Sequence, residues 1–79
     1  MNKAALAAIL EDEGIHSNAY GLDGGHPSEA YVLAEDGYVW SVYYSERGLE
    51  TSKRTFPSEA EACLHLLTVL RGDSTARRS

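Results

Sequence analysis

Residues 29–48, EAYVLAEDGYVWSVYYSERG, place the strongest constraint on the fold, because they have the pattern of one β-hairpin. Two runs rich in Tyr, Val, Leu and Trp meet at Asp36-Gly37, a dipeptide that readily supplies the positive φ angles of a tight turn. A two-residue turn at this point pairs the large side chains across one face: Leu33 with Trp40, Tyr31 with Val42, and Glu29 with Tyr44. We expect this face, the Trp40 face, to lie in the core.

The other face of the hairpin is smaller and more polar. It carries Ala30, Val32, Ala34, Val39, Ser41, Tyr43 and Ser45. The asymmetry fixes the face that is buried, because a slip of one residue would turn every large side chain to the wrong side. We expect this second face, the Tyr43 face, to be at least partly open.

A helix is expected on each side of the strands. Residues 2–13 have apolar spacing typical of a helix, with Asn2 as N-cap and Gly14 in the left-handed position that ends it. Residues 58–71 begin with a capping box, Ser58 with Glu61. The expected apolar stripe of this second helix comprises Ala60, Cys63, Leu64, Leu67 and Leu70, widened by Ala62, Leu66 and Val69.

Two further strands are expected, a short one within residues 17–22 and one over residues 49–56. A three-residue loop Glu46-Arg47-Gly48, with Gly48 left-handed in a bulge, would bring Phe56 onto the Trp40 face. The fold class is therefore α+β: a three- to four-stranded antiparallel meander with the N- and C-terminal helices packed on one face. Its 79 residues allow one domain, expected over residues 1–72, with residues 73–79 as a disordered polar tail.

The net charge and the single cysteine limit the classes of function that are compatible with this sequence. A net charge of −5 disfavours direct nucleic-acid binding and is compatible with a basic protein partner. Cys63 has no second cysteine to pair with, which fits a reducing cytoplasm. The N-terminal apolar run meets Glu11-Asp12-Glu13 too early for a signal peptide or a membrane span, so we expect a soluble cytoplasmic protein without membrane contact.

The sequence contains no signature of catalysis, of a cofactor or of a metal. Cys63 and His65 are two apart on a helix and point away from each other, which disfavours a zinc site. For His65 we expect an exposed pair with Glu61, one turn away. The glycines of residues 21–25 have neither the spacing of a Walker loop nor that of a dinucleotide loop. We therefore expect a non-catalytic protein with no cofactor and no metal.

Two places on the hairpin are candidates for binding a partner. Tyr43 projects from the weaker face, where it either binds a partner or simply covers the back of the sheet. Glu46 and Arg47 lie at a loop tip, where they either engage a partner or remain a solvated turn. Both interpretations stay open for each place.

Three stretches resemble a group of small bacterial immunity proteins encoded beside secreted polymorphic toxins. These stretches are VYYSERG (residues 42–48), FPSEAEACLHLL (residues 56–67) and ILEDEGI (residues 9–15), the last followed by Tyr20. In that group an aromatic strand ending in S-E-R-G is followed by a phenylalanine, an acidic helix start and an Ala-Cys pair. The resemblance covers most of residues 5–70.

The resemblance implies a cytoplasmic antitoxin, monomeric until it binds a cognate toxin whose active-site surface is basic. The residues expected to bind the toxin are Tyr43, Glu46 and Arg47, followed by Asp23, Glu35 and Asp36. The alternative from another class is a small regulatory or scaffolding module that self-associates through the open sheet face.

Overall fold

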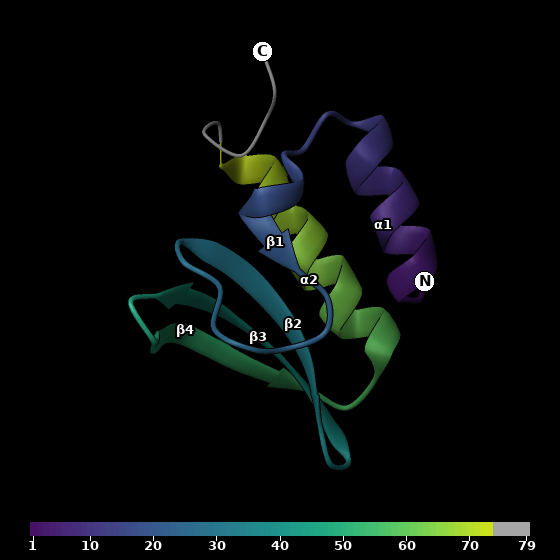
Figure 1. Cartoon of the computed structure of the whole chain (residues 1–79). Coiled ribbons are helices and arrows are strands. Elements are labelled where there is room, and N and C mark those ends of the chain that lie inside the picture. The colour runs from purple at the N-terminus through teal and green to yellow at the C-terminus, as the bar shows by residue number, and fades with distance from the viewer. Residues whose placement is uncertain (74–79) are drawn as a thin grey trace.

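The computed structural model describes residues 1–73 and confirms an α+β architecture with a helix near each end (Figure 1). Its elements are α1 (Lys3–Asp12), a 3₁₀ turn η1 (Ser17–Ala19), β1 (Tyr20–Gly21), β2 (Ala30–Asp36), β3 (Val39–Glu46), β4 (Leu49–Phe56) and α2 (Glu59–Gly72). Asp73 is the C-cap of α2. The rest of the tail expected over residues 73–79 lies outside the described residues.

Local signals set the ends of both helices as the sequence predicts. The side chain of Asn2 accepts a hydrogen bond of 2.9 Å from the backbone N–H of Ala5. Gly14 has a φ of 75°, and the N–H of Ile15 reaches back to the carbonyl of Leu10 at 2.9 Å, as a Schellman ending requires. At the start of α2, Ser58 accepts from the N–H of Glu61 at 3.3 Å and donates to its carboxylate at 3.0 Å, which completes the capping box.

The sheet has the order β1-β2-β3-β4 and is mixed instead of purely antiparallel. β1 runs parallel to β2, with Tyr20 beside Tyr31 and Gly21 beside Val32. β1 and β2 are parallel because residues 22–29 return the chain along the sheet before β2 begins, so both strands run the same way. The remaining strands are antiparallel neighbours joined by tight turns.

The first hairpin turns one residue later than expected. Asp36 pairs with Val39, so Gly37 and Tyr38 form the turn, with Gly37 at φ 68° in the first central position. The pairing therefore differs by two residues from the expected one: Leu33 lies opposite Val42, and Tyr31 opposite Tyr44. Because side chains alternate with a period of two, the composition of the two faces is unchanged.

The second hairpin has its irregularity inside a strand instead of at the turn. Glu46 pairs with Leu49, so Arg47 and Gly48 form a two-residue turn with φ angles of 52° and 79°, and the expected three-residue loop is wrong. Phe56 still reaches its place opposite Trp40, because the register shifts between Val42 and Tyr44. Ser52, opposite this shift, has a positive φ of 55° and marks a β-bulge.

The main core lies between the Trp40 face of the sheet and the helices. α2 packs on β2, β3 and β4, and α1 packs beside α2 (Figure 1). The buried side chains here are Leu6, Leu10, Ile15, Leu33, Val42, Ala62, Cys63, Leu66, Leu67 and Leu70. Ala60 and Leu64, expected in the stripe, are exposed, because the buried arc of α2 is centred on Cys63, Leu66 and Leu70.

The Tyr43 face of the sheet is covered over much of β2 and β3 and stays partly open at Val39, which is 37% exposed, and along β4. Residues 22–29, hereafter the covering loop, cross in front of β2 and β3 (Figure 1). Val32 is fully buried beneath them and Tyr43 is only 4% exposed. The loop approaches closely: a Cβ added to Gly24, which has a φ of 72°, would lie 3.6 Å from the Cβ of Ala34. The domain is therefore a sheet between a helical layer and a loop layer.

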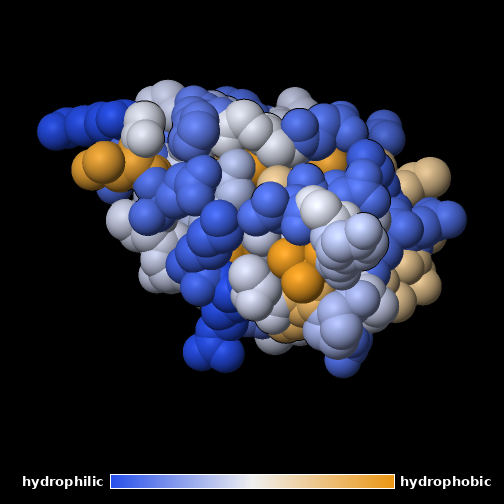
Figure 2. All heavy atoms as spheres, turned by 90° about the horizontal axis from the view of Figure 1, so that it is seen from below, coloured by the Kyte–Doolittle hydropathy of each residue, from blue (hydrophilic) through white to orange (hydrophobic). Residues whose placement is uncertain are grey.

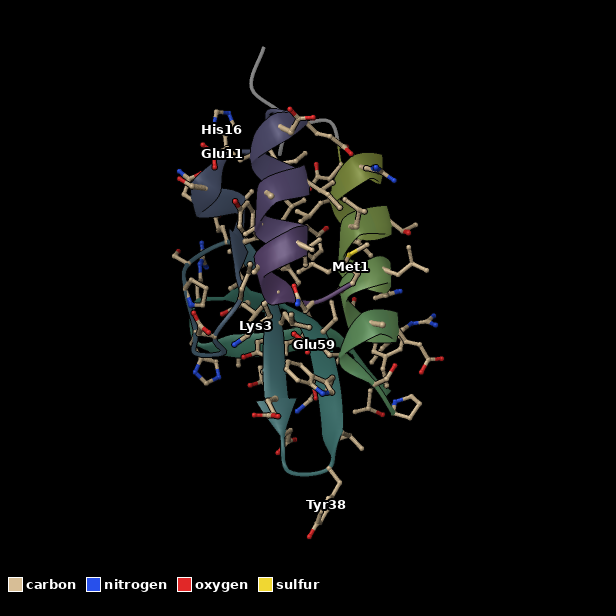
Figure 3. The ribbon with its side chains drawn as sticks, turned by 90° about the vertical axis from the view of Figure 1, so that its right-hand side faces the viewer. Met1, Lys3, Glu11, His16, Tyr38 and Glu59 are labelled. Atoms are coloured by element: carbon tan, nitrogen blue, oxygen red, sulfur yellow. The ribbon has the colours of Figure 1, made fainter. Side chains whose placement is uncertain are left out.

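Polar contacts join the two helices at both ends. The backbone N–H of Lys3 donates to the carboxylate of Glu59 at 2.9 Å, so this carboxylate serves the N-termini of α1 and α2 together (Figure 3). At the other end Nε of Arg71 donates to Glu13 at 2.9 Å. Glu13, part of the acidic cluster that ends α1, therefore has a structural partner in α2.

Candidate protein-binding surface

Five of the six residues expected to bind a partner separate into two groups at opposite ends of the sheet, and the sixth, Tyr43, lies within β3. Glu46 and Arg47 lie at the β3–β4 turn. Glu35 and Asp36 end β2 at the β2–β3 turn, and Asp23 lies in the covering loop. The eight residues of β3 hold the two turns apart, which corresponds to about 23 Å at roughly 3.3 Å per residue. The structure therefore does not form one site from all six residues.

Tyr43 is interior. Its hydroxyl donates a hydrogen bond of 2.7 Å to the carbonyl oxygen of Gly25. Burial raises the pKa of this phenol, and the charge of Glu50 adds to the effect. The expectation that Tyr43 is exposed is wrong, because the covering loop packs over it. Of the two interpretations of this residue, covering the back of the sheet agrees with the geometry.

Asp23 holds the covering loop against α1. Its carboxylate lies 2.9 Å from Nζ of Lys3, and 87% of its side chain is exposed. The hydrogen bond to Asp23 raises the pKa of Lys3, and the charges of Asp23 and Glu59 act in the same direction. The carboxylate of Asp23 thus has a partner within the chain and still faces solvent.

A hollow of about 320 Å³ lies near the β2–β3 turn and is lined by residues of the covering loop, β2, β3 and β4. Its lining brings together Glu35, Asp36 and Tyr43, three of the expected residues, with side chains that sequence reasoning missed. We call it the acidic hollow; its lining residues are Gly24, Gly25, His26, Ala34, Glu35, Asp36, Ser41, Tyr43, Glu50 and Lys53.

Glu50 is the centre of the polar contacts in the acidic hollow. Its carboxylate lies 2.9 Å from Nε2 of His26 and 3.5 Å from Nζ of Lys53. The hydrogen bond from His26 lowers the pKa of Glu50, and Lys53 contributes in the same sense. Lys53 also places its ammonium 5.8 Å from the ring centroid of Tyr43. The hollow thus already holds one cation belonging to this chain.

Two serine hydroxyls of β3 have no hydrogen-bond partner among the described residues. They are Ser41 Oγ and Ser45 Oγ, on residues that are 1% and 0% exposed. A buried hydroxyl without a partner is costly, so each calls for an explanation. Ser41 lines the acidic hollow, whereas Ser45 does not.

The most exposed aromatic side chain is one that the sequence did not single out. Tyr38 is fully exposed in the β2–β3 turn and projects beyond the sheet (Figure 3), and Val39 beside it is 37% exposed. Seen from this end, the surface has a small hydrophobic group surrounded by hydrophilic side chains (Figure 2). Had Gly37 been assigned to the first turn position, Tyr38 would have been identified as a loop residue.

The opposite end offers a smaller apolar contact. Arg47 is exposed at the β3–β4 turn, and Leu49, which follows the turn, is 66% exposed. Behind the turn, Tyr31 and Tyr44 contact each other edge to face with ring centroids 4.8 Å apart. Glu46 and Arg47 therefore project from a well-packed strand end.

His65 does not form the expected pair with Glu61. Its ring lies against Phe56, with centroids 5.1 Å apart, while the carboxylate of Glu61 accepts from Ser58. Burial lowers the pKa of His65, and the charge of Arg54 lowers it further. The capping box thus sets the orientation of the Glu61 side chain, and packing against Phe56 sets the orientation of the His65 ring.

Within residues 1–73 no three His, Cys, Asp or Glu side chains gather as a metal site. Neither α1 nor α2, the helices of the described part, is long and apolar enough to cross a membrane. No protein-family model, curated protein or solved structure matches this chain.

Proposed function

We propose that this protein is a cytoplasmic immunity protein that binds and neutralises a cognate secreted bacterial toxin domain without catalysis. The observation that carries the proposal is Tyr38, fully exposed at the end of the β2–β3 hairpin and next to the carboxylates of Glu35 and Asp36. The resemblance of residues 42–48 and 56–67 to immunity proteins of polymorphic toxin systems supports the same class.

Tyr38 has the properties of a binding anchor. Folding does not require it, since its ring contacts solvent on all sides, yet the strands that present it are held by α2 and by the covering loop. A tyrosine on a rigid support loses little conformational entropy on binding, and tyrosine is enriched among the residues that dominate interface energies. The tip thus offers a solvent-exposed aromatic side chain on an ordered hairpin.

The carboxylates around the tip favour a basic partner. Glu35, Asp36 and Asp23 lie at this end of the molecule, and the whole chain carries a net charge of −5. An acidic inhibitor surface accelerates encounter with a positively charged active site and disfavours acidic partners. A toxin that acts on nucleic acid or nucleotides presents such a site.

Glu46 and Arg47 provide a second point of contact. A typical interface buries about 800 Å² on each partner, which is about 30 Å across. One toxin domain can therefore contact both turns along β3. In this proposal Tyr38 and the carboxylates form the main contact, and Arg47 contributes at its rim.

The test begins with the genes that neighbour this one, where the proposal expects a secreted toxin domain. Co-expression should restore growth of bacteria that produce the toxin domain, and the purified proteins should form a one-to-one complex. Tyr38→Ala should weaken the complex by about 30-fold, the effect of a typical hot spot of about 2 kcal/mol. Leu64→Ala, which truncates an exposed leucine on α2, is the matched control and should change affinity by less than about twofold.

Two results would contradict the proposal at different levels. Absence of both growth rescue and binding by the unmodified chain would reject the immunity function. A tight complex that Tyr38→Ala and Arg47→Ala leave unchanged would retain the function and reject this surface. The alternative, a small regulatory or scaffolding module that self-associates through the open sheet face, has less support, because the covering loop buries Val32 and Tyr43 on that face.

A further inference from the structure

The acidic hollow already shows how a cation is bound. Nζ of Lys53 lies 5.8 Å from the ring centroid of Tyr43 and 3.5 Å from Oε1 of Glu50. A carboxylate beside an aromatic face is the environment in which proteins hold ammonium and guanidinium groups. Lys53 is 41% exposed in its side chain and extends from the edge strand β4, so it can leave the hollow without disturbing the core.

The hollow has more acceptors than Lys53 uses. Asp36 and Glu50 contribute two carboxylates to the lining on the Tyr43 face, against the single ammonium of Lys53. Lys53 contacts Glu50, so its ammonium leaves the carboxylate of Asp36 to a further donor. A second cation, or one with more donors than an ammonium, would therefore be bound more completely.

Ser41 is an independent sign that the hollow is built for a polar occupant. The residue is 1% exposed, lines the hollow from β3, and its Oγ has no hydrogen-bond partner among the described residues. A hydroxyl left without a partner at a buried position costs folding free energy, which a donor from a bound group would recover.

From this geometry we infer that the acidic hollow receives an arginine side chain of the toxin, which displaces Lys53 and lies against the Tyr43 ring. This deepens the proposed function and rests on it for the partner's identity. A guanidinium has five N–H donors in a planar fork, so it satisfies carboxylates and a hydroxyl together, which an ammonium does less completely. Tyr38, at the adjacent turn, would contact the toxin surface around that arginine.

The experiment measures this binding without the toxin. The full chain, labelled with ¹⁵N, is titrated with N-acetyl-arginine amide, and the backbone amides of Gly24, Gly25 and Ser41 are followed by NMR. N-acetyl-citrulline amide, which has nearly the same shape and no charge, is the matched ligand. We expect saturable shifts at these amides with the arginine compound, in the millimolar range, and none with the citrulline compound.

Three variants sharpen the test. Lys53→Gln removes the competing cation and should tighten binding of the arginine compound by about threefold or more, the effect of a partly exposed ion pair. Arg54→Gln removes the same charge from the neighbouring residue, which lines a different groove beside His65, and should leave binding unchanged. Asp36→Asn should weaken binding.

Three results would each overturn the inference. The first is an equal response to the arginine and citrulline compounds, and the second is the absence of a saturable shift even in Lys53→Gln. The third is a shift at the same amides with inorganic phosphate, which would show that the hollow binds anions. Any of these, with toxin neutralisation intact, would reject only the arginine site. Failure of toxin binding with arginine binding intact would reject the proposed function instead.

Discussion

The hydroxyl of Tyr43 donates a hydrogen bond of 2.7 Å to the carbonyl oxygen of Gly25, which joins the central strand β3 to the covering loop. This contact lies on the face of the sheet opposite the helices. Together with the ion pair between Asp23 and Lys3, it fastens a loop that has no regular secondary structure of its own. Most of the second face of β2 and β3 is thereby an interior surface.

Removing this hydrogen bond should destabilise the domain. Tyr43→Phe leaves the ring in place and leaves the Gly25 carbonyl without its donor, so we expect the free energy of unfolding to fall by about 1 kcal/mol. Urea denaturation measures the change. Tyr38→Phe removes the same hydroxyl from a fully exposed ring and should have no measurable effect; equal losses in the two variants would show that the contact with Gly25 is not responsible.

Two serines should respond to alanine substitution with opposite signs. Ser45→Ala removes a fully buried hydroxyl that has no partner among the described residues, so stability should rise by up to about 1 kcal/mol. Ser58→Ala removes the N-cap of α2 and should cost about 1 kcal/mol. Thermal and urea unfolding of the unmodified protein and the two variants measure these changes. A loss of stability in Ser45→Ala would mean that the Ser45 hydroxyl has a hydrogen-bond partner.

A β-branched residue at the bulge in β4 should destabilise the domain. Ser52 has a φ of 55°, a region that valine avoids, so Ser52→Val should lower the free energy of unfolding by about 1 kcal/mol. Thr51→Val, at the adjacent exposed position without a positive φ, is the control and should change stability by less than about 0.5 kcal/mol. Similar effects at both positions would argue against the bulge at Ser52.

His65 should make the domain less stable in mild acid. Burial against Phe56 lowers the pKa of this imidazole below its usual value of about 6.5, with Arg54 contributing. The unfolded chain therefore binds the proton more readily, so the contribution is fully present above about pH 6.5 and is lost as the pH falls toward the folded-state pKa.

Two measurements follow from the position of His65. NMR titration should place its midpoint below about 6.5, and Arg54→Gln should raise that midpoint by a smaller amount than burial lowers it. His65→Gln should reduce the loss of stability between neutral pH and pH 5.5. A midpoint at or above the usual value would contradict the burial of this ring.

The features that follow from a few neighbouring residues were predictable. The Asn2 cap, the Schellman ending at Gly14 and the capping box of Ser58 with Glu61 each depend on hydrogen bonds within one turn of helix. The composition of the two faces of β2 and β3 was also correct, because it depends only on the period of two. The exact turn position was not, since Asp36-Gly37 and Gly37-Tyr38 both satisfy the local rule.

The candidate surface was predicted only in part. Tyr43 and Tyr38 are both aromatic residues of the same hairpin, and no local signal separates them. Tyr43 is covered because the loop returns across its face, whereas Tyr38 extends past the end of the sheet. The positions of Glu35, Asp36 and Arg47 at exposed strand ends agree with the sequence, since turn residues remain at the surface wherever the layers pack.

The sequence by itself determined the elements, their caps and the two faces of the central hairpin, because periodicity and turn chemistry act over a few residues. Only the tertiary structure decided that residues 22–29 cover the second face of β2 and β3, that Ser52 and not Gly48 absorbs the register shift, and that Lys53 lies over Tyr43. These contacts join residues distant in sequence, and their geometry depends on how three layers fit together. The acidic hollow is a product of that fit.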